Sequence, residues 1–361
     1  MAQPLVISVD AMGGDHGPDV VIPALDLVLL AHPGVRFIVH GDESRITPWL
    51  EKHPGLKPLV SVAHTDSFIA MDEKPAQAVR RGRGTSLYNA LQSVKSGDAQ
   101  AMVSAGNTGA LMALSRMVLK MAAPGLERPA IAASWPTERG ISTVLDVGAN
   151  VSCDAGQLLE FAIMGAAFHR ALRGVEKPSI GLLNVGSEDV KGHEDVREAH
   201  ALLRGTNLGL NYQGFVEGDD LCKGTVDVVV TDGFTGNIAL KTAEGTARFI
   251  KGLMKESLLS SLRAKLGALL AAPALRAMAA KVDPSAINGG PLLGLNGIVI
   301  KSHGGTDVRG FATAVGVAIN LAASSYTDDI KASMAHLLQV INEGPVIEAD
   351  FDDDDAETDE D

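Results

Sequence analysis

The sequence predicts a three-layer α/β fold, in which helices cover both faces of a mostly parallel, doubly wound sheet and an amphipathic helical hairpin protrudes. Short, continuously apolar runs predict strands that are buried on both faces, as in a parallel sheet. These runs alternate with longer helical patterns along most of the chain, which is typical of strand–loop–helix repeats. The 39 glycines against 14 aromatic residues predict many tight turns.

The expected elements follow one another in a regular order. A strand at residues 5–9 leads through a polar loop at 10–19 into a helix at 20–30, and a second strand follows at 36–40. Further strands are expected at residues 101–104, 143–146, 180–184, 226–231 and 297–300. We expect residues 1–345 to form a single α/β domain and the acidic stretch 346–361 to be disordered.

Residues 247–282 differ from the rest because they carry seven basic residues and one acidic residue in a chain whose net charge is −13. Leucines recur there at helical spacing, with basic side chains between them. The candidate docking residues are Leu258, Leu262, Arg263, Lys265, Leu266 and Leu269. Pro273 is expected to break the segment into two helices, which would form a hairpin inserted in the domain.

Charge and cysteine content exclude several classes of protein. Ten of the 44 acidic residues lie within residues 348–361, so the rest of the chain carries a net charge of about −3, and no basic stripe favours nucleic acid as a partner. Cys153 and Cys222 are too few for a disulfide framework or a four-ligand zinc site. No signal peptide or membrane-spanning run is expected, which favours the cytoplasm.

The first candidate site is the loop after the first strand. Two carboxylates, an imidazole and three glycines fall within nine positions there, and Asp15 with His16 has the chemistry for acid–base work or metal binding. The alternative is a tight turn whose aspartates bind nearby backbone amides. The candidate residues in this loop are Asp10, Gly13, Gly14 and Asp15.

The second candidate site lies where the strand at residues 101–104 leads into a helix. Helix N-termini offer unpaired amides and partial positive charge, which favour phosphate. Glycines in this loop permit close approach, and polar side chains add donors; the alternative is that Asn or Thr caps its own helix. The candidate residues are Ser104, Gly106, Asn107, Thr108 and Gly109.

Two later strand ends carry single candidates. Lys191 is suited to hold an anionic oxygen, with Glu188 to orient it, although most loop lysines are simply solvated. His303 lies among glycines after a late strand and is a candidate proton donor, unless it only packs and caps. The chain has no G-x-S-x-G nucleophile motif, and Cys153 is expected to be a buried thiol, so direct attack by a bound phosphate on an acyl group fits best.

The motifs resemble those of the PlsX family of acyl-(acyl-carrier-protein):phosphate acyltransferases. The resemblance extends from about residue 5 to about residue 342 and excludes the acidic tail. The motifs, in the family's order, are VDAMGGDHGP at 9–18, DEKPAQAVR at 72–80, SAGNTGALMA at 104–113, VLDVGAN at 144–150, GLLNVGSEDVKG at 181–192, DGFTGN at 232–237 and PLLGLNGIVIKSHG at 291–304.

The resemblance implies a reaction and roles for several residues. Inorganic phosphate and a long-chain acyl-carrier-protein thioester would give acyl phosphate and free carrier. The amides at residues 106–109, with Asn107 and Thr108, would hold phosphate, and Lys191 would offset its charge. Asn237 would donate to the oxyanion, and His303 would protonate the thiolate. Further site candidates are Asp10, Asp15, Asn150, Asp232 and Thr235. The three aspartates among them would orient loops.

The resemblance also implies partners. The family forms homodimers, uses no metal or organic cofactor, has a fold similar to phosphotransacetylases and isocitrate-type dehydrogenases, and supplies a glycerol-3-phosphate acyltransferase in phospholipid synthesis. The cationic hairpin is expected to dock on anionic lipid, or else to pack in the dimer. The alternatives are a short-chain phosphotransacetylase that uses coenzyme A, an NAD-dependent decarboxylating dehydrogenase and a non-enzymatic scaffold.

Overall fold

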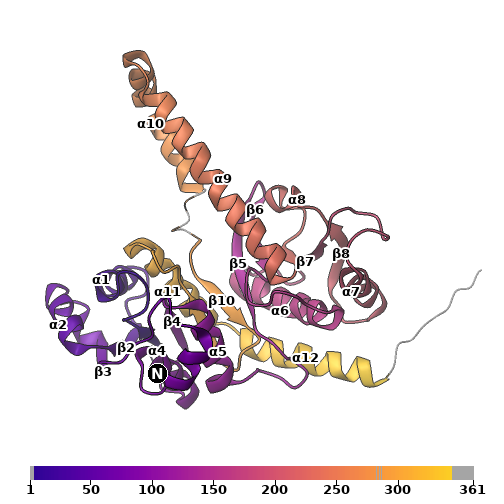
Figure 1. Cartoon of the computed structure of the whole chain (residues 1–361), viewed down its shortest axis with the longest axis horizontal. Helices are drawn as coiled ribbons and strands as arrows, with labels where there is room; N and C mark the ends of the chain where they lie inside the picture. Colours follow the sequence, from indigo (N-terminus) through magenta and orange to yellow (C-terminus); the bar gives the residue numbers. More distant parts are fainter. Residues whose placement is uncertain (1–3, 282, 284, 286, 344–361) are drawn as a thin grey trace, which may run out of the picture.

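The computed structural model describes residues 4–281, 283, 285 and 287–343, and Figure 1 shows one long sheet flanked by helices. Its eleven strands follow the order β3-β2-β1-β4-β11-β10-β5-β6-β9-β7-β8. The expected disordered tail, residues 346–361, lies outside the described residues. On β4, Ala101 and Val103 join one core cluster and Met102 joins another, so both faces of the sheet are covered and the α/β prediction is confirmed.

The first half-sheet contains four parallel strands and the helices between them. Its elements are β1 (Val6–Asp10), α1 (Pro18–Leu29), β2 (Arg36–Gly41), α2 (Glu43–Lys52), the 3-10 turn η1 (Lys57–Leu59), β3 (Val60–His64), α3 (Pro75–Arg81), α4 (Ser86–Ser96), β4 (Ala101–Ser104) and α5 (Thr108–Leu119). β11 (Ile298–Lys301) returns late in the chain to pair in parallel with β4 and is followed by α11 (Val308–Ala322) and α12 (Tyr326–Glu343).

The second half-sheet is also parallel. Its elements are β6 (Gly140–Leu145), α6 (Ala155–Arg173), β7 (Ser179–Leu183), α7 (Glu194–Gly205), β8 (Asn211–Val216), α8 (Asp220–Lys223) and β9 (Val228–Val230). Its α6 is buried along most of its length, because Phe161 and Phe168 pack into the core. The capping box of Asp154 and Gln157 starts this helix.

Two antiparallel strands, β5 (Ala130–Thr137) and β10 (Gly290–Leu293), join the halves. Gly290 pairs with Lys301 at the end of β11, and a Cβ on Gly290 would lie 3.0 Å from the carbonyl oxygen of Ala132. Ala132 in turn pairs with Leu145 at the end of β6. The carboxyl ends of the two half-sheets therefore face each other at this junction, which is where open α/β sheets bind ligands.

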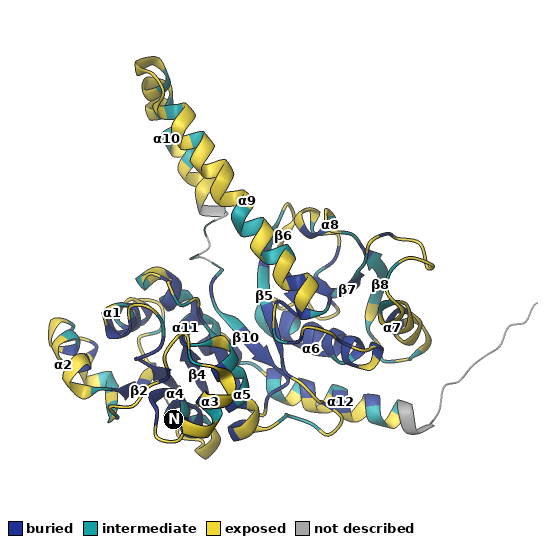
Figure 2. Ribbon diagram, viewed as in Figure 1, coloured by how far each residue is buried: buried dark blue, intermediate teal, exposed yellow. Residues whose placement is uncertain are grey.

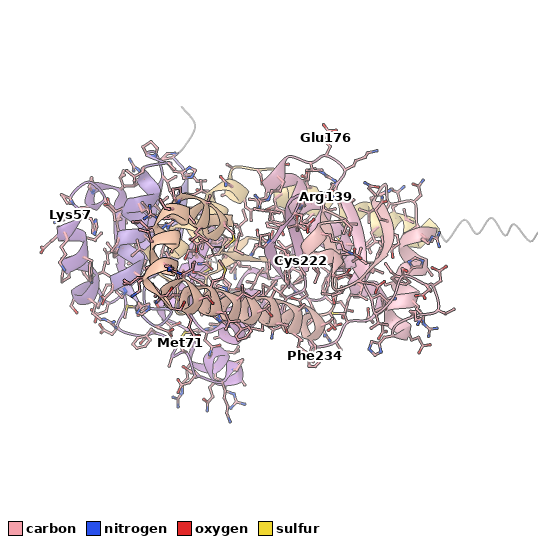
Figure 3. The ribbon with its side chains drawn as sticks, turned by 90° about the horizontal axis from the view of Figure 1, so that it is seen from above. Lys57, Met71, Arg139, Glu176, Cys222 and Phe234 are labelled. Atoms are coloured by element: carbon pink, nitrogen blue, oxygen red, sulfur yellow. The ribbon has the colours of Figure 1, made fainter. Side chains whose placement is uncertain are left out.

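The hairpin consists of α9 (Gly233–Leu259) and α10 (Leu262–Lys281). The expectation that Pro273 separates the helices is wrong, since Pro273 lies inside α10. The chain reverses at Ser260 and Ser261, whose hydroxyl accepts from the amide of Ala264 at 3.1 Å and so caps α10. Figure 2 shows the hairpin exposed along most of its length, and in Figure 3 it leans from Phe234 toward the first half.

The candidate docking leucines differ in helix and in exposure. Leu262, Leu266 and Leu269 are 85%, 63% and 71% exposed on α10, whereas Leu258 is half-buried on α9. Within the described residues, no single helix is long and apolar enough to span a membrane; α9 with α10, bent by 120°, and α11 with α12, bent by 59°, pass a length-and-composition test only as pairs.

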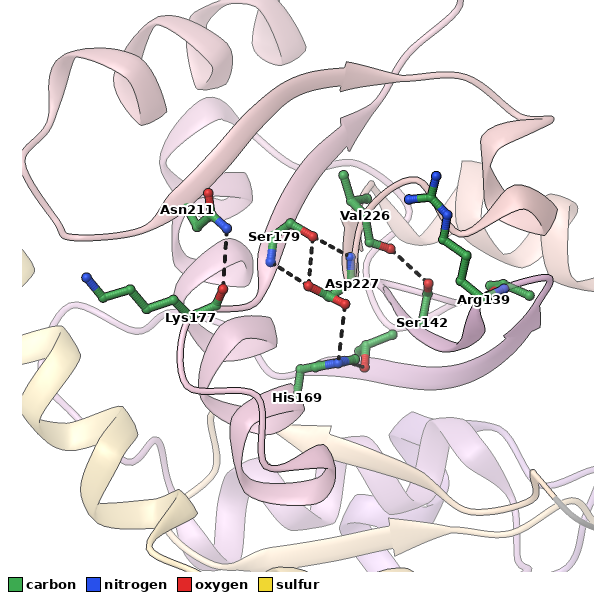
Figure 4. A network of polar contacts seen from close by, with 10 residues as sticks. Arg139, Ser142, His169, Lys177, Ser179, Asn211, Val226 and Asp227 are labelled. Carbon is green, nitrogen blue, oxygen red and sulfur yellow. Dashed lines mark hydrogen bonds and ion pairs between the residues drawn. The ribbon is translucent and has the colours of Figure 1, made fainter.

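A polar network fastens the second half-sheet at the ends of its strands remote from the junction (Figure 4). The carboxylate of Asp227 accepts from the amide and hydroxyl of Ser179 at 2.8 and 2.7 Å. His169 lies 3.9 Å from the same carboxylate and 3.0 Å from the hydroxyl of Thr143. Burial lowers the pKa of His169. Because Ser179 and Asp227 lie at the amino ends of β7 and β9, away from the junction, we assign this network to structure.

Candidate active site

The loops after β1 and β4 are joined by a buried hydrogen-bond relay. The amide of Gly106 donates to the hydroxyl of Ser104 at 3.0 Å, and this hydroxyl donates to the carboxylate of Asp10 at 2.7 Å. The amide of Met12 also donates to Asp10 at 3.3 Å. Burial raises the pKa of Asp10, and the hydrogen bond from Ser104 opposes that shift. Asp10 and Ser104 therefore hold two loops in register.

Glycines allow these loops to touch. A Cβ on Gly13 would lie 2.6 Å from the amide nitrogen of Gly106, so no other residue fits. Gly14 adopts a φ of 87° and its Cα faces Ala105 and the carbonyl of Gly304. That carbonyl accepts from the amide of Asp15 at 2.9 Å. The loops after β1, β4 and β11 thus meet at one place.

Lys301, at the end of β11, places an amine among these loops. Its Nζ donates to the carbonyl oxygen of Ala105 at 3.3 Å and to that of Ser302. Burial lowers the pKa of Lys301 to about 8, although Asp10 and Asp15 pull in the opposite direction. This lysine was not among the sequence-based candidates.

Asn107 has a structural role in this arrangement. Its Oδ1 accepts from the amide of Ala110 at 3.0 Å and caps α5, while its Nδ2 donates to the carbonyls of Met71 and Glu73 at 2.8 and 2.9 Å. The side chain of Asn107 therefore caps its own helix, which is the alternative to phosphate binding given above. The amides of residues 107–109 have no hydrogen-bond partner in the part of the chain that the structure describes, and they remain available to an anion.

In the second half, the buried carboxylate of Asp146 organises the loop after β6. It accepts from the amides of Ile131, Gly148, Ala149 and Asn150 at 2.7 to 3.2 Å. Asn150 also donates from its side chain to Asp146 and to the carbonyl of Pro129, both at 2.9 Å. Asn150, a predicted binding residue, therefore has both side-chain hydrogens committed to the loop.

The start of α9 adjoins this loop. Asp232 accepts from both the amide and the hydroxyl of Thr235 at 2.8 Å, so these two predicted binding residues cap the helix together. Asn237, one turn later, is exposed and lies beside Gly148, where a Cβ would be 3.6 Å from its Cγ. The side chain of Asn237 has no hydrogen bond within the described part of the chain, which leaves its carboxamide free for a ligand.

At the junction, a charged side chain of α9 lies near the loop after β11. Nε2 of His303 lies 3.9 Å from Oε1 of Glu244 near the middle of α9. Glu244 also accepts from Nζ of Lys241 at 3.0 Å. Partial removal from water, and then the charges of Lys241 and Lys301, lower the pKa of His303, while Glu244 raises it. His303 is therefore largely neutral near pH 7.

The loop after β7, which carries Lys191, makes its described contacts within the second half. Lys191 is exposed, and its carbonyl accepts from the side chain of Asn184 at 3.1 Å. Asp189 in the same loop reaches His200 and Arg204 of α7 at 3.5 and 3.7 Å. No contact within the described residues joins the Lys191 side chain to Asn107 or Asn237, although all three follow carboxyl ends of strands.

Other reactive groups are accounted for structurally. Burial and the charges of Asp146 and Asp232 raise the pKa of Cys153 to about 12, which makes its thiol a poor nucleophile. One group within the described residues has metal-ligand spacing, Asp42, His64 and Asp66. Its members are already engaged, since Asp42 caps α2 and Nδ1 of His64 accepts from the amide of Glu43 at 3.1 Å.

Three residues of the site escaped sequence reasoning: Lys301, Asp146 and Glu244. Lys301 is the last residue of β11 and Asp146 directly follows β6, and this position at the carboxyl end of a strand is a signal by which both can be found. The sequence carries no such signal for Glu244, because its approach to His303 depends on how far α9 extends across the junction.

Comparison with known proteins places this site in a family. The model of a family described as "fatty acid synthesis protein" matches residues 5–328. The "phosphate acyltransferase" of Caulobacter vibrioides is 62% identical over 337 residues, 93% of both chains. The chain belongs to the PlsX family of phosphate acyltransferases. A second phosphate acyltransferase, from Phenylobacterium zucineum, is 54% identical over 337 residues, 93% of this chain and 95% of that one.

A solved structure shares the fold of this chain. A phosphotransacetylase from Streptococcus pyogenes aligns over 89% of this chain and 95% of its own, with a TM-score of 0.61 and 18% identity. At that identity the likeness concerns the fold alone. It confirms the predicted similarity to phosphotransacetylases. The family match and the phosphate acyltransferase relatives, rather than this fold likeness, show that the chain is an acyltransferase of fatty acid synthesis.

Proposed function

We propose that the chain transfers a long-chain acyl group from the thioester of an acyl carrier protein to inorganic phosphate, which supplies acyl phosphate for phospholipid synthesis. The observation that carries this proposal is the junction of the half-sheets. One side of the junction holds the free backbone amides of residues 107–109 and the amine of Lys301. The other side holds the free side-chain carboxamide of Asn237. The first group suits a phosphate, and the second suits a carbonyl oxygen.

The chemistry needs no covalent enzyme intermediate. A phosphate oxygen attacks the thioester carbon, the carbonyl electrons move to oxygen, and the collapse of this adduct breaks the carbon–sulfur bond. The products are acyl phosphate and a thiolate, which takes up a proton. The raised pKa of Cys153 is in keeping with direct attack.

The residues divide the work in this proposal. The amides of residues 107–109 hold phosphate, with Thr108 at its edge, and the positive charges of Lys191 and Lys301 lower the cost of bringing it to the thioester. Asn237 donates to the oxyanion. Neutral His303 donates a hydrogen bond to the departing sulfur, a leaving group that needs little protonation.

A second function, short-chain phosphotransacetylation with coenzyme A, is favoured by the phosphotransacetylase fold. The two functions differ in the thioester that phosphate cleaves fastest. Acyl phosphate can be trapped with hydroxylamine as a hydroxamate, with palmitoyl-carrier protein, palmitoyl-CoA and acetyl-CoA compared at equal concentration. Faster product formation from palmitoyl-carrier protein supports the proposal, and faster formation from acetyl-CoA overturns it. In the same assay Lys191→Ala is expected to lose at least about ten-fold in turnover.

The proposal includes a place in the cell. Acyl phosphate is an anhydride that hydrolyses in water, so delivery at a membrane protects it. The exposed leucines and the basic residues Arg263 and Lys265 of α10 suit the surface of an anionic bilayer on its cytoplasmic side. A homodimer associated peripherally with the membrane would hand acyl phosphate to a glycerol-3-phosphate acyltransferase there.

A further inference from the structure

The segment that covers the Asn107 loop carries an unpaired positive charge. Lys74, Arg80, Arg81 and Arg83 are all exposed, and we call these four residues the basic α3 face. None of them forms an ion pair within the residues that the structure describes. Four free cations within ten positions stand out in a chain whose net charge is −13.

Packing directs this charge outward. Ala78 is fully buried on the inner side of α3, which packs against α5. Gly82 continues this contact, since a Cβ there would lie 2.9 Å from Cδ2 of Leu114. The buried side of α3 thus holds the segment against the body, and Arg80 and Arg81 extend into solvent.

The same segment is attached directly to the candidate active site. The side chain of Asn107 binds the carbonyls of Met71 and Glu73, and a Cβ on Gly109 would lie 2.6 Å from Cγ of Pro75. Met71 reaches across to the loop after β11, where its Cε would be 2.7 Å from a Cβ on Gly304. The segment that carries the basic α3 face therefore contacts the loop that holds the free amides at the start of α5.

An apolar margin lies between the charge and the site. Phe68 is 49% exposed and Met71 is 41% exposed. Figure 3 shows Met71 on the same side of the molecule as Phe234, which is 60% exposed at the base of α9. Exposed apolar side chains bordered by arginine are typical of protein–protein contacts.

We propose that the basic α3 face, with Phe68 and Met71, is the docking surface for the acidic carrier protein that delivers the acyl thioester. The inference rests on the proposed function and adds where its macromolecular substrate binds. Carboxylates on an acidic protein complement arginines through paired hydrogen bonds. The attachment of Met71 to Asn107 places the start of this surface beside the loop that holds the free amides. The tip of the hairpin, by contrast, projects far from the strand ends (Figure 1).

The test compares two thioesters on one enzyme. The variant Arg80→Glu/Arg81→Glu reverses charge on the basic α3 face, and Lys57→Glu/Lys177→Glu makes the same change in net charge at exposed sites elsewhere. Hydroxamate formation is measured with palmitoyl-carrier protein and with palmitoyl-pantetheine, which lacks the protein. We expect the Arg80/Arg81 variant to raise KM for the carrier substrate about ten-fold or more, since charge governs encounter.

The other activities show whether a change in KM comes from lost docking or from a general loss of function. Activity of the Arg80/Arg81 variant on palmitoyl-pantetheine is expected to stay unchanged, as are both activities of the Lys57/Lys177 control. Unchanged KM for the carrier substrate, or an equal loss on both thioesters, overturns the docking surface alone. Loss of binding to phosphatidylglycerol vesicles with unchanged KM also overturns it, because the face would then serve a membrane. A wild-type enzyme that leaves palmitoyl-carrier protein intact overturns the proposed function itself.

Discussion

Nε2 of His303, at the end of β11, lies 3.9 Å from Oε1 of Glu244 on α9. This contact joins the first half-sheet to the helix that the second half-sheet projects across the junction. It also means that the charge of Glu244 acts on the imidazole that faces the proposed site.

Replacement of Glu244 is expected to change the titration of His303 in a defined direction. Glu244 raises the pKa of His303, so Glu244→Gln is expected to lower it. The ring proton resonances of His303, assigned with His303→Asn, measure the shift by NMR. An unchanged or raised pKa in Glu244→Gln would show that the two side chains are not adjacent in solution.

Lys301 predicts a pH dependence of phosphate use. Its pKa of about 8 means that its ammonium form, which attracts phosphate, is lost as the pH rises through 8. We expect kcat/KM for phosphate to fall above that pH, and Lys301→Met to be less active at pH 7 and to lack this decline. Lys241 lowers the pKa of Lys301, so Lys241→Met is expected to move the decline to higher pH. A profile that is the same in all three proteins would exclude Lys301 from phosphate binding.

Two asparagines at strand ends are expected to behave differently. Asn237 is exposed and has no structural partner within the described residues, so Asn237→Ala is expected to lower kcat roughly 100-fold without loss of stability. Asn107 caps α5 and holds the 71–73 segment, so Asn107→Ala is expected to lower the free energy of unfolding by about 1–2 kcal/mol. Urea unfolding and hydroxamate kinetics measure both quantities. Equal stability losses would contradict the assigned roles.

The hairpin predicts a lipid contact through α10. Leu262→Glu/Leu266→Glu places charges on its exposed apolar face, and we expect the variant to stop floating with phosphatidylglycerol vesicles. Leu30→Glu/Leu202→Glu serves as the matched control, because both leucines are exposed elsewhere. Sedimentation identifies the alternative: a variant that still floats but changes from dimer to monomer would assign α10 to dimer packing.

Strand ends could be predicted because they depend on local pattern. Apolar runs such as residues 101–104 mark buried strands wherever they occur, and the polar loops after them must lie at the carboxyl edge. The break at Ser260 and Ser261 was missed because proline is a strong helix breaker in general, yet Pro273 is accommodated within α10. Local capping by Ser261 decided the position of the turn.

The site itself required the three-dimensional structure. β10 joins β5 to β11, and such nonlocal pairing leaves no local signature, so the meeting of the two carboxyl edges could not be predicted in detail. Lys301 was missed because an isolated lysine is usually solvated, and its burial appears only when three loops close around it. Asn107 was expected to hold phosphate, and the resemblance implied Asn150, Asp232 and Thr235 as further candidates. The sequence alone does not show that hydrogen bonds within their own loops occupy most of these polar groups.

A crystal structure of the enzyme with inorganic phosphate at a concentration that saturates turnover tests the central claim most directly. The account predicts a phosphate on the amides of residues 107–109, within hydrogen-bond distance of Nζ of Lys301, and opposite the side chain of Asn237. Phosphate bound only elsewhere on the molecule, with these amides occupied by other groups, would contradict it.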